Sequence, residues 1–253
     1  MKFQPEKTMK KTFFVGLVCA VLIMCFIGTA KAGPIIVFDG FEGTQIDPYW
    51  TIFSQNASAS LSTNQSYSGQ QSLQITAPSV YWGLQQDAHI SHQYDQLQEG
   101  SLSVRFYDAL GGNNMYSGFG LSRSDSGIAG LGVTDWNPFQ YLGSPGNPDG
   151  STSISRTLGW HLFQIDASAT GATAYIDGTA ISATHSGDYR FDKVTLSLSG
   201  PGWRNGGTAY YDNFTFTSNA AVPEPSTYAL LGIGGLLVVL RLRKARVLSA
   251  FSA

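Results

Sequence analysis

The chain has 253 residues, of which 13% are charged and 13% aromatic, and it contains 29 glycines. Few charges with many aromatic residues and glycines are typical of a β-rich secreted domain and unlike a disordered chain. Between residues 33 and 221 lie six basic and fifteen acidic side chains. This acidic balance argues against nucleic acid as a partner, because phosphate binding needs clustered Lys and Arg.

The N-terminal residues 1–32 are predicted to be a signal peptide. A basic stretch around Lys10 and Lys11 precedes the nearly unbroken apolar run 13–27, and Ala30-Lys31-Ala32 fits the small-x-small rule for cleavage. The alternative is an uncleaved membrane anchor.

Both cysteines, Cys19 and Cys25, lie in this N-terminal segment. If it is removed, the mature domain has no disulfide, no thiolate nucleophile and no Cys-ligated metal. A lipoprotein modified at Cys25 is a further alternative, but Met24 is too large for the residue before a modified cysteine.

Residues 33–218 are predicted to form one domain, an all-β antiparallel β-sandwich. Short runs that alternate apolar and polar residues are separated by Gly, Asn, Asp, Ser and Pro, and period-2 runs with polar outward faces indicate antiparallel sheets packed face to face. Asp177-Gly178 predicts a hairpin turn, and 108–114 and 143–151 are expected to be loops. The alternating runs are 72–76, 101–107, 160–166, 172–176, 194–198 and 210–216.

The C-terminal residues 219–253 form a separate module. Its apolar segment, 228–240, would span roughly 20 Å as a helix, which is short against about 30 Å of hydrocarbon. The basic end 241–246 should stay cytoplasmic by the positive-inside rule. The motif Val222, Pro223, Glu224 and Pro225 precedes the apolar segment, and the basic residues Arg241, Arg243, Lys244 and Arg246 follow it.

This order of features closely resembles the PEP-CTERM sorting signal of Gram-negative bacteria. The resemblance implies recognition by an exosortase-like membrane enzyme, contact with the membrane through the C-terminal segment before processing, and delivery to the cell envelope, cell surface or extracellular matrix. The family is associated with extracellular polysaccharide and biofilm matrix. An ordinary C-terminal anchor is the alternative interpretation.

Several short sequence segments of the central domain resemble segments of concanavalin A-like lectin/glucanase sandwiches, including laminin-G-like modules and jelly rolls. The resemblance supports the fold more than the function, because this fold carries many functions. The segments are Phe38-Asp39-Gly40-Phe41-Glu42, Ser66 to Leu73, Gly159 to Asp166 with Ala174 to Ile181, and Tyr211-Asp212-Asn213-Phe214.

The same resemblance implies a structural calcium ion near the terminal strands. Glu42 and Asp212 are the positions carried over, with Asp39 as a third, and their alternative role is as surface carboxylates. His89 and His92 are not expected to bind a metal jointly, because a spacing of three on a strand puts them on opposite faces.

Sugar binding needs exposed aromatic faces and fixed polar groups. Trp136, Tyr141 and Trp203 are the candidates, because they lie in turn-rich stretches. Each could instead belong to the core. Trp160, on an alternating run, is expected in the core.

The sequence lacks the motifs that would be expected of an enzyme with this fold. Glu42 and Glu99 are the only glutamates between residues 33 and 221 and neither belongs to a Glu-x-Asp-x-Glu pattern, and no Gly-x-Ser-x-Gly is present. The sequence therefore predicts a non-catalytic surface or matrix protein that binds polysaccharide. A secreted glycan-active enzyme and a purely structural matrix protein are the alternatives.

Overall fold

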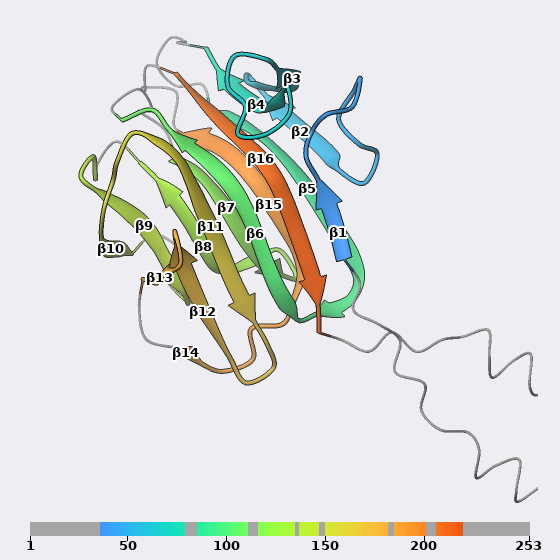
Figure 1. The fold of residues 1–253 in the computed structure, drawn as a ribbon. Coiled ribbons are helices and arrows are strands. Elements are labelled where there is room, and N and C mark those ends of the chain that lie inside the picture. Colours follow the sequence, from blue (N-terminus) through green and yellow to red (C-terminus); the bar gives the residue numbers. More distant parts are fainter. Residues whose placement is uncertain are drawn as a thin grey trace, which may run out of the picture. The chain divides into compact units, whose positions relative to one another are not determined.

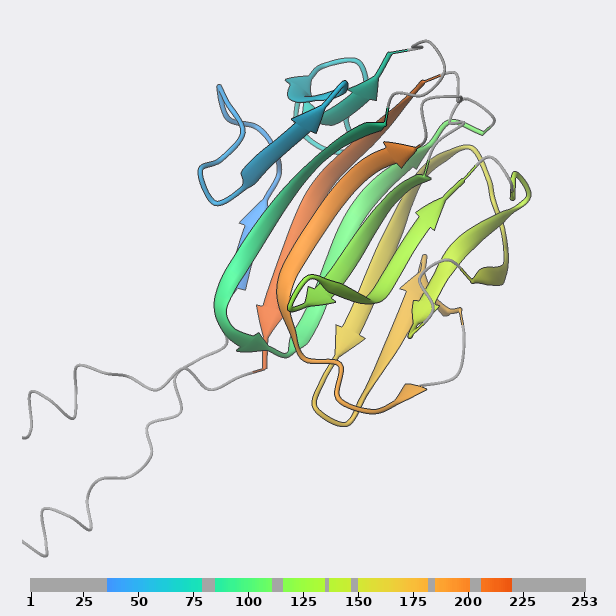
Figure 2. The same cartoon turned by 180° about the vertical axis from the view of Figure 1, so that it is seen from behind.

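A computed structural model shows the domain as two antiparallel β-sheets that face each other, one at the front in Figure 1 and the other at the front in Figure 2. All regular elements of the described residues are strands, which confirms the predicted all-β sandwich. Residues 34–220 form one compact unit. The expected signal peptide and the C-terminal segment lie outside the described residues, which are 36–78, 85–110, 116–134, 137–146, 150–181, 185–200 and 206–219.

The first sheet has the order β13-β12-β11-β6-β16-β4-β3, with β1 beside β16 and β14 beside β12. Its central strands run side by side across the near face in Figure 1. The bounds are β1 (Ile36–Asp39), β3 (Ser58–Ser62), β4 (Ser72–Ala77), β6 (Gly100–Asp108), β11 (Gly159–Ala167), β12 (Gly171–Ile176), β13 (Thr179–Ala180), β14 (His185–Ser186) and β16 (Gly207–Ser218).

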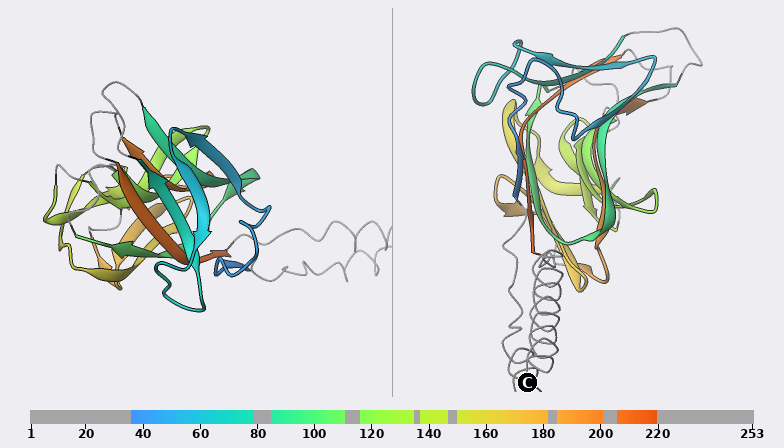
Figure 3. Two further views of the ribbon diagram at one scale, coloured as in Figure 1. Left: turned by 90° about the horizontal axis from the view of Figure 1, so that it is seen from above. Right: turned by 90° about the vertical axis from the view of Figure 1, so that its right-hand side faces the viewer.

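The second sheet has the order β10-β9-β8-β7-β15-β5-β2. The side view in Figure 3 shows it as a separate layer behind the first sheet. The bounds are β2 (Thr51–Gln55), β5 (Gln86–Gln98), β7 (Tyr116–Arg123), β8 (Ser126–Val133), β9 (Gln140–Pro145), β10 (Ser151–Ser155) and β15 (Phe191–Gly200).

The core lies between the two sheets and is rich in aromatic rings. Alternation along each strand turns every second side chain inward, and Phe106, Phe163, Phe191 and Phe216 are fully buried. Phe106 stacks on Phe163, with ring centroids 5.0 Å apart. The sandwich therefore builds its stability from apolar burial.

Two expectations about turns had different outcomes. The Asp177-Gly178 hairpin is confirmed, with φ values of 49° and 78° at the two turn residues. The expected loop 143–151 is shorter than predicted, because β9 continues to Pro145 and β10 begins at Ser151. Gly143 lies in β9. A Cβ at this position would lie 2.1 Å from the carbonyl oxygen of Gly130, so the position needs glycine for β8 and β9 to pack this closely.

Within the residues that the structure describes, no helix is long and apolar enough to cross a membrane.

A pair of partly buried tyrosines joins the segment before β2 to β5. The hydroxyls of Tyr49 and Tyr94 lie 2.6 Å apart, and the ring of Tyr49 stacks on His92 at 3.7 Å between centroids. Burial raises the pKa of Tyr49 to about 12. Burial also raises the pKa of Tyr94, and the neighbouring Tyr49 adds to the effect.

We predict that the free energy of unfolding falls as the pH rises from about 10 to about 12, measured by urea unfolding. An unfolded tyrosine loses its proton near pH 10, whereas folded Tyr49 keeps its proton to about pH 12. The folded state therefore binds more protons in this window, and stability falls with rising pH. The double variant Tyr49→Phe, Tyr94→Phe should show a shallower decline, and an equal decline would contradict this account.

Candidate functional site

An aromatic patch lies on the outer face of the first sheet, where β6, β11 and β16 begin or end together. Tyr107 pairs with Trp160 across β6 and β11, and with Tyr210 across β6 and β16. Tyr67, on the loop before β4, completes the patch, and its side chain is 45% exposed. We call Tyr67, Tyr107, Trp160 and Tyr210 the aromatic patch.

The four rings are fixed by edge contacts. Trp160 lies 5.4 Å from Tyr107 and 6.1 Å from Tyr67 between ring centroids, and Tyr107 lies 6.2 Å from Tyr210. The interplanar angles are 65°, 67° and 86°, respectively. Edge-to-face packing holds each ring without laying one ring flat on the next, so it orders the patch.

Polar side chains border the aromatic patch. The guanidinium carbon of Arg105 lies 4.2 Å from the centroid of the Tyr67 ring, a cation–π contact. Gln74 donates a hydrogen bond to the Tyr210 hydroxyl at 3.3 Å. The patch thus combines apolar faces with a cation and an amide in defined positions.

The loop that carries Tyr67 is fastened by Asp212. This carboxylate is fully buried and accepts hydrogen bonds from the backbone N–H of Tyr67 at 2.8 Å and of Ser68 at 3.1 Å. A bulge in β16 adds one residue after Asp212, and Asn213 has φ 49° there. Bulges redirect side chains at functional edges, and here one lies beside the acid that positions the loop.

Glu42 fastens the other side of the same loop. Its carboxylate accepts hydrogen bonds from the backbone N–H of Gln70 and of Gln71, each at 3.1 Å. Gly69 lies between the two clamps with φ +65°, and a Cβ on it would come within 2.3 Å of a Glu42 oxygen. The segment Ser66 to Leu73 therefore contains a loop whose backbone amides bind the Glu42 carboxylate.

Burial raises the pKa of Asp212 above its usual range. The amide donors of Ser68 and Tyr67 oppose this effect, and the charge of Glu42 adds to it. The two acids are thus close enough to repel each other, and the loop amides offset that cost.

The three residues predicted to hold calcium have other partners in the structure. Asp39 accepts hydrogen bonds from Trp50 Nε1 at 2.8 Å and from the N–H of Phe41 at 2.7 Å, while Glu42 and Asp212 hold the loop. Among the described residues, no group of three His, Cys, Asp or Glu side chains is placed to hold a metal ion. The calcium expectation gains no support here and stays a prediction.

Of the three residues predicted to bind sugar, the structure describes Tyr141. Trp136 and Trp203 lie outside the described residues. Tyr141 lies in the core, with its side chain 1% exposed, which differs from the exposed ring that its turn-rich surroundings favoured. Its ring packs edge-on against Phe163 at 5.6 Å, so it has no free face for a sugar.

A buried ion pair explains why Tyr141 turns inward. Arg156 donates two hydrogen bonds to Asp108, from Nε at 2.9 Å and from Nη2 at 2.7 Å. Burial, followed by the charge of Asp108, raises the pKa of the Tyr141 hydroxyl above its usual range. Tyr141 thus lies buried beside the ion pair, with its hydroxyl next to Asp108.

Trp160 corrects a second expectation. It was predicted in the core, but it is half-buried on the outer face, and His161 takes the inward position beside it. The alternating run was identified correctly, but its phase follows Phe163 and Ile165, which are fully buried. Counting back from these residues in steps of two would have placed Trp160 outside.

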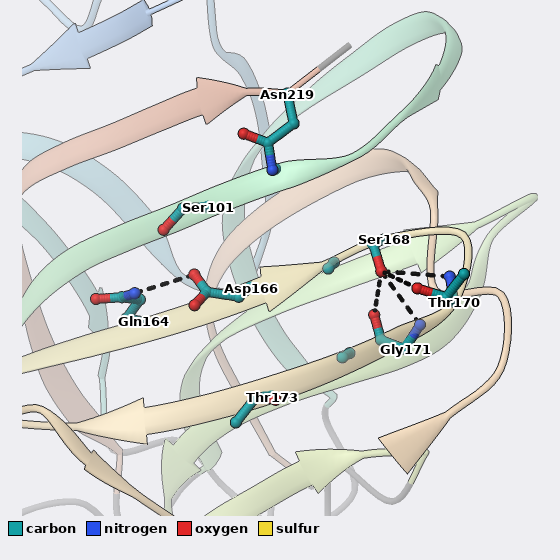
Figure 4. Close-up of a pocket in the computed structure, with 11 residues that line it drawn as sticks. Ser101, Gln164, Asp166, Ser168, Thr170, Gly171, Thr173 and Asn219 are labelled. Carbon is teal, nitrogen blue, oxygen red and sulfur yellow. Dashed lines mark hydrogen bonds between the residues drawn. The ribbon is translucent and has the colours of Figure 1, made fainter. Parts of the chain in front are cut away.

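A polar hollow of about 420 Å³ lies at the other end of the same outer face. Figure 4 shows Ser101 on β6, Gln164 and Asp166 on β11 and Thr173 on β12, with Ser168 and Thr170 at the turn beside them. Gln164 donates a hydrogen bond to Asp166 Oδ1 at 3.0 Å. Asn219, the last described residue, completes the wall.

The outer face of the second sheet is different in kind. Phe53 on β2 is 44% exposed and stacks on His89 at 4.9 Å, and Phe139, directly before β9, is 77% exposed. On β7, Gly118 and Gly120 alternate with the buried Phe119 and Leu121. Within the described residues, the first sheet therefore offers the larger group of outward aromatic rings.

Comparison with protein families places a known motif in the tail. Residues 221–244 match the model of the PEP-CTERM protein-sorting motif. This segment is where the sequence resemblance was found, so that interpretation is confirmed. The motif is a signal for exosortase-dependent export to the cell envelope or surface. Among curated proteins, none matches this chain in sequence.

Solved structures share the sandwich fold. Cellulose induced protein Cip1 matches with a TM-score of 0.50 at 15% identity, over 74% of this chain and 97% of that one. The Crh5 transglycosylase in complex with NAG matches with a TM-score of 0.51 at 16% identity, over 76% and 87%. A sialidase matches with a TM-score of 0.56 at 10% identity, over 74% of this chain but only 18% of its own. At these identities the likeness shows the fold, a concanavalin-like sandwich.

We predict that Asp212→Ala lowers the free energy of unfolding by about 2–6 kcal/mol, because the loop amides of Tyr67 and Ser68 lose their acceptor at about 1–3 kcal/mol each. Urea unfolding of the full chain in detergent measures it, with and without calcium. Asp95→Ala is the matched control, since Asp95 is exposed on β5. A loss for Asp212→Ala no larger than that of the control would contradict the role of Asp212.

Proposed function

We propose that this protein, which carries a PEP-CTERM sorting motif at residues 221–244 behind a concanavalin-like β-sandwich, is an exported surface or matrix protein that binds polysaccharide without cleaving it. The observation that carries the proposal is the aromatic patch on the outer face of the first sheet.

The two termini give the proposed route of export. The signal peptide 1–32 directs the chain across the inner membrane of a Gram-negative cell, and cleavage follows Ala32. Pro223 and Pro225 disfavour a helix and keep that segment extended. An exosortase-like enzyme then processes the tail, whose apolar run of roughly 20 Å suits a temporary membrane segment better than a permanent span.

A sugar ring presents an apolar face bordered by hydroxyl groups, and the aromatic patch matches both parts. Aromatic faces bury the apolar part of the ring, while a few placed polar groups fix its orientation. Trp160 and Tyr67 supply rings, and Arg105 and Gln74 supply donors beside them. Because the rings pack against one another, little side-chain order has to be gained when a ligand binds.

Trp136 and Trp203 remain candidates for the same site. The segment 201–205 connects β15 to β16, and Tyr210 lies close to the start of β16. The segment 135–136 follows β8, and the carbonyl of Thr134 accepts a hydrogen bond from Arg156, which also holds Asp108 at the end of β6. The described strands on either side of these segments therefore end near the aromatic patch, which supports keeping both tryptophans as candidates.

The carboxylates of the described residues support a non-catalytic role. A glycosidase needs two carboxyl groups that face the scissile bond. Glu42 and Asp212 are mutually close, but both accept hydrogen bonds from the loop backbone, and Asp212 is fully buried. In this pair the buried Asp212 and the exposed Glu42 both hold the loop in place through hydrogen bonds with its backbone.

One arrangement of residues resembles a nucleophile, a base and an acid. Thr157 Oγ1 lies 3.3 Å from His161 Nε2, and His161 Nδ1 lies 2.7 Å from Asp177. However, Nε2 lies closer, at 2.8 Å, to the carbonyl oxygen of Thr157. A carbonyl accepts only, so Nε2 must carry a proton there and is not free to act as a base. The alternative of a glycan-active enzyme thus rests on the names of structurally similar proteins.

We predict that Trp160→Ala abolishes retention of the full chain, in detergent, by a polysaccharide that the wild type binds in affinity electrophoresis. The loss removes the ring that contacts both Tyr67 and Tyr107. Trp136→Ala and Trp203→Ala should each weaken retention.

The matched control is Phe53→Ala, which removes an exposed ring from the second sheet and should leave retention unchanged. Loss with Phe53→Ala but not with Trp160→Ala would move the site to the second sheet. If the wild type is retained by no neutral or anionic polysaccharide, the proposed function fails. Release of reducing ends from any of them would favour the enzyme.

We also predict that mass spectrometry of the native surface protein finds an N-terminus at Gly33 and a C-terminus upstream of the apolar segment 228–240, because the signal peptide and the sorting tail are removed. A surface-displayed form that still contains Pro223 to Arg246 would contradict tail processing. A mass above that of the trimmed chain would identify an attached group.

A further inference from the structure

The polar hollow and the aromatic patch lie on one continuous strip. Antiparallel pairing of β6 with β11 aligns their outward residues in rows: Tyr107 with Trp160, Arg105 with Leu162, Ser103 with Gln164, and Ser101 with Asp166. Six residues separate the first row from the last, which corresponds to about 20 Å along the strands. The strip changes from aromatic at one end to hydroxyl, amide and carboxylate at the other.

The lining of the hollow matches the chemistry of sugar hydroxyls. Ser101, Thr170 and Thr173 have hydroxyl groups, Gln164 and Asn219 have amides, and the carboxylate is Asp166. In the described part of the chain, Asp166 accepts one side-chain hydrogen bond, at Oδ1 from Gln164, which leaves Oδ2 as an acceptor for a ligand hydroxyl. Hydrogen bonds to a charged group are the stronger kind.

The charge around the hollow selects against anions. Asp166 is in its lining, and among the described residues that line the hollow there is no Lys or Arg. Glu99 lies next to it, since its carboxylate accepts the N–H of Ala169 at 3.2 Å and its carbonyl accepts the N–H of Asn219 at 3.0 Å. A neutral polyhydroxylated ligand meets no repulsion there, whereas a uronate or a phosphate does.

We infer that the polar hollow is a second subsite for the polysaccharide bound at the aromatic patch, so that one neutral glycan chain runs along β6 and β11 over both. This inference rests on the proposed function. It assigns the aromatic patch to stacking and the hollow to recognition of hydroxyl groups on a distant sugar of the same chain. Binding then depends on chain length, because a short oligosaccharide cannot reach from one subsite to the other.

The test measures binding of the full chain, in detergent, to a disaccharide and a hexasaccharide of the neutral glycan retained best in electrophoresis, by isothermal titration calorimetry. We expect Asp166→Ala to weaken hexasaccharide binding about tenfold, because a charge-assisted hydrogen bond is lost, and to leave disaccharide binding unchanged. Asp166→Asn keeps one acceptor oxygen and should lose less. Asp95→Ala, which removes an exposed acid from the second sheet, should change neither.

A second readout uses charge. Retention by alginate, an anionic polysaccharide, should increase in Asp166→Asn relative to the wild type, which a purely structural role of Asp166 would not produce. Unchanged hexasaccharide binding in Asp166→Ala, with binding still lost in Trp160→Ala, would overturn the second subsite and leave the proposed function standing. If the wild type binds no glycan at all, both fail.

Discussion

A sheet that buries one face commits its other face to solvent, and this constraint determines where the candidate site lies. On β6, the buried Leu102, Val104 and Phe106 fix the outward direction of Arg105 and Tyr107. A shift by one residue would exchange the two sets and expose the core. The energy that holds the core in register therefore also holds the aromatic patch, and the site needs no stabilisation of its own along the strands.

The loop of Tyr67 lacks this support from strand pairing, and two acids replace it, the buried Asp212 and the exposed Glu42. Asp212 and Glu42 accept four of the loop's backbone donors between Tyr67 and Gln71. Burial of a carboxylate is costly unless hydrogen bonds compensate it, and the loop amides provide this compensation. The acids and the loop thus stabilise each other, which makes the position of Tyr67 as defined as that of the strand residues.

The sequence predicts the sandwich well because alternation is a local signal, and β6, β11 and β16 follow the predicted runs closely. It predicts the site less well because the phase of a run and the partner of a loop depend on distant residues. Trp160 was assigned to the wrong face, and Tyr141 was drawn inward near the Asp108–Arg156 pair, whose members are 48 positions apart. The role of Asp212 depends on a bulge and on a loop 145 residues away, and neither is visible in a local pattern.

The distribution of charge along the chain reflects both the targeting of the protein and the chemistry of its surface. Nine of the fifteen basic residues lie in the two terminal segments, where they serve targeting and membrane orientation. Residues 33–221 contain the other six, together with fifteen acidic residues. A negative surface repels anionic polymers at long range and more weakly at high salt. Neutral glycans are not repelled in this way, so their affinity depends on direct contacts with the protein surface. The strip on β6 and β11, with rings at one end and hydroxyl-binding groups at the other, supplies contacts of that kind.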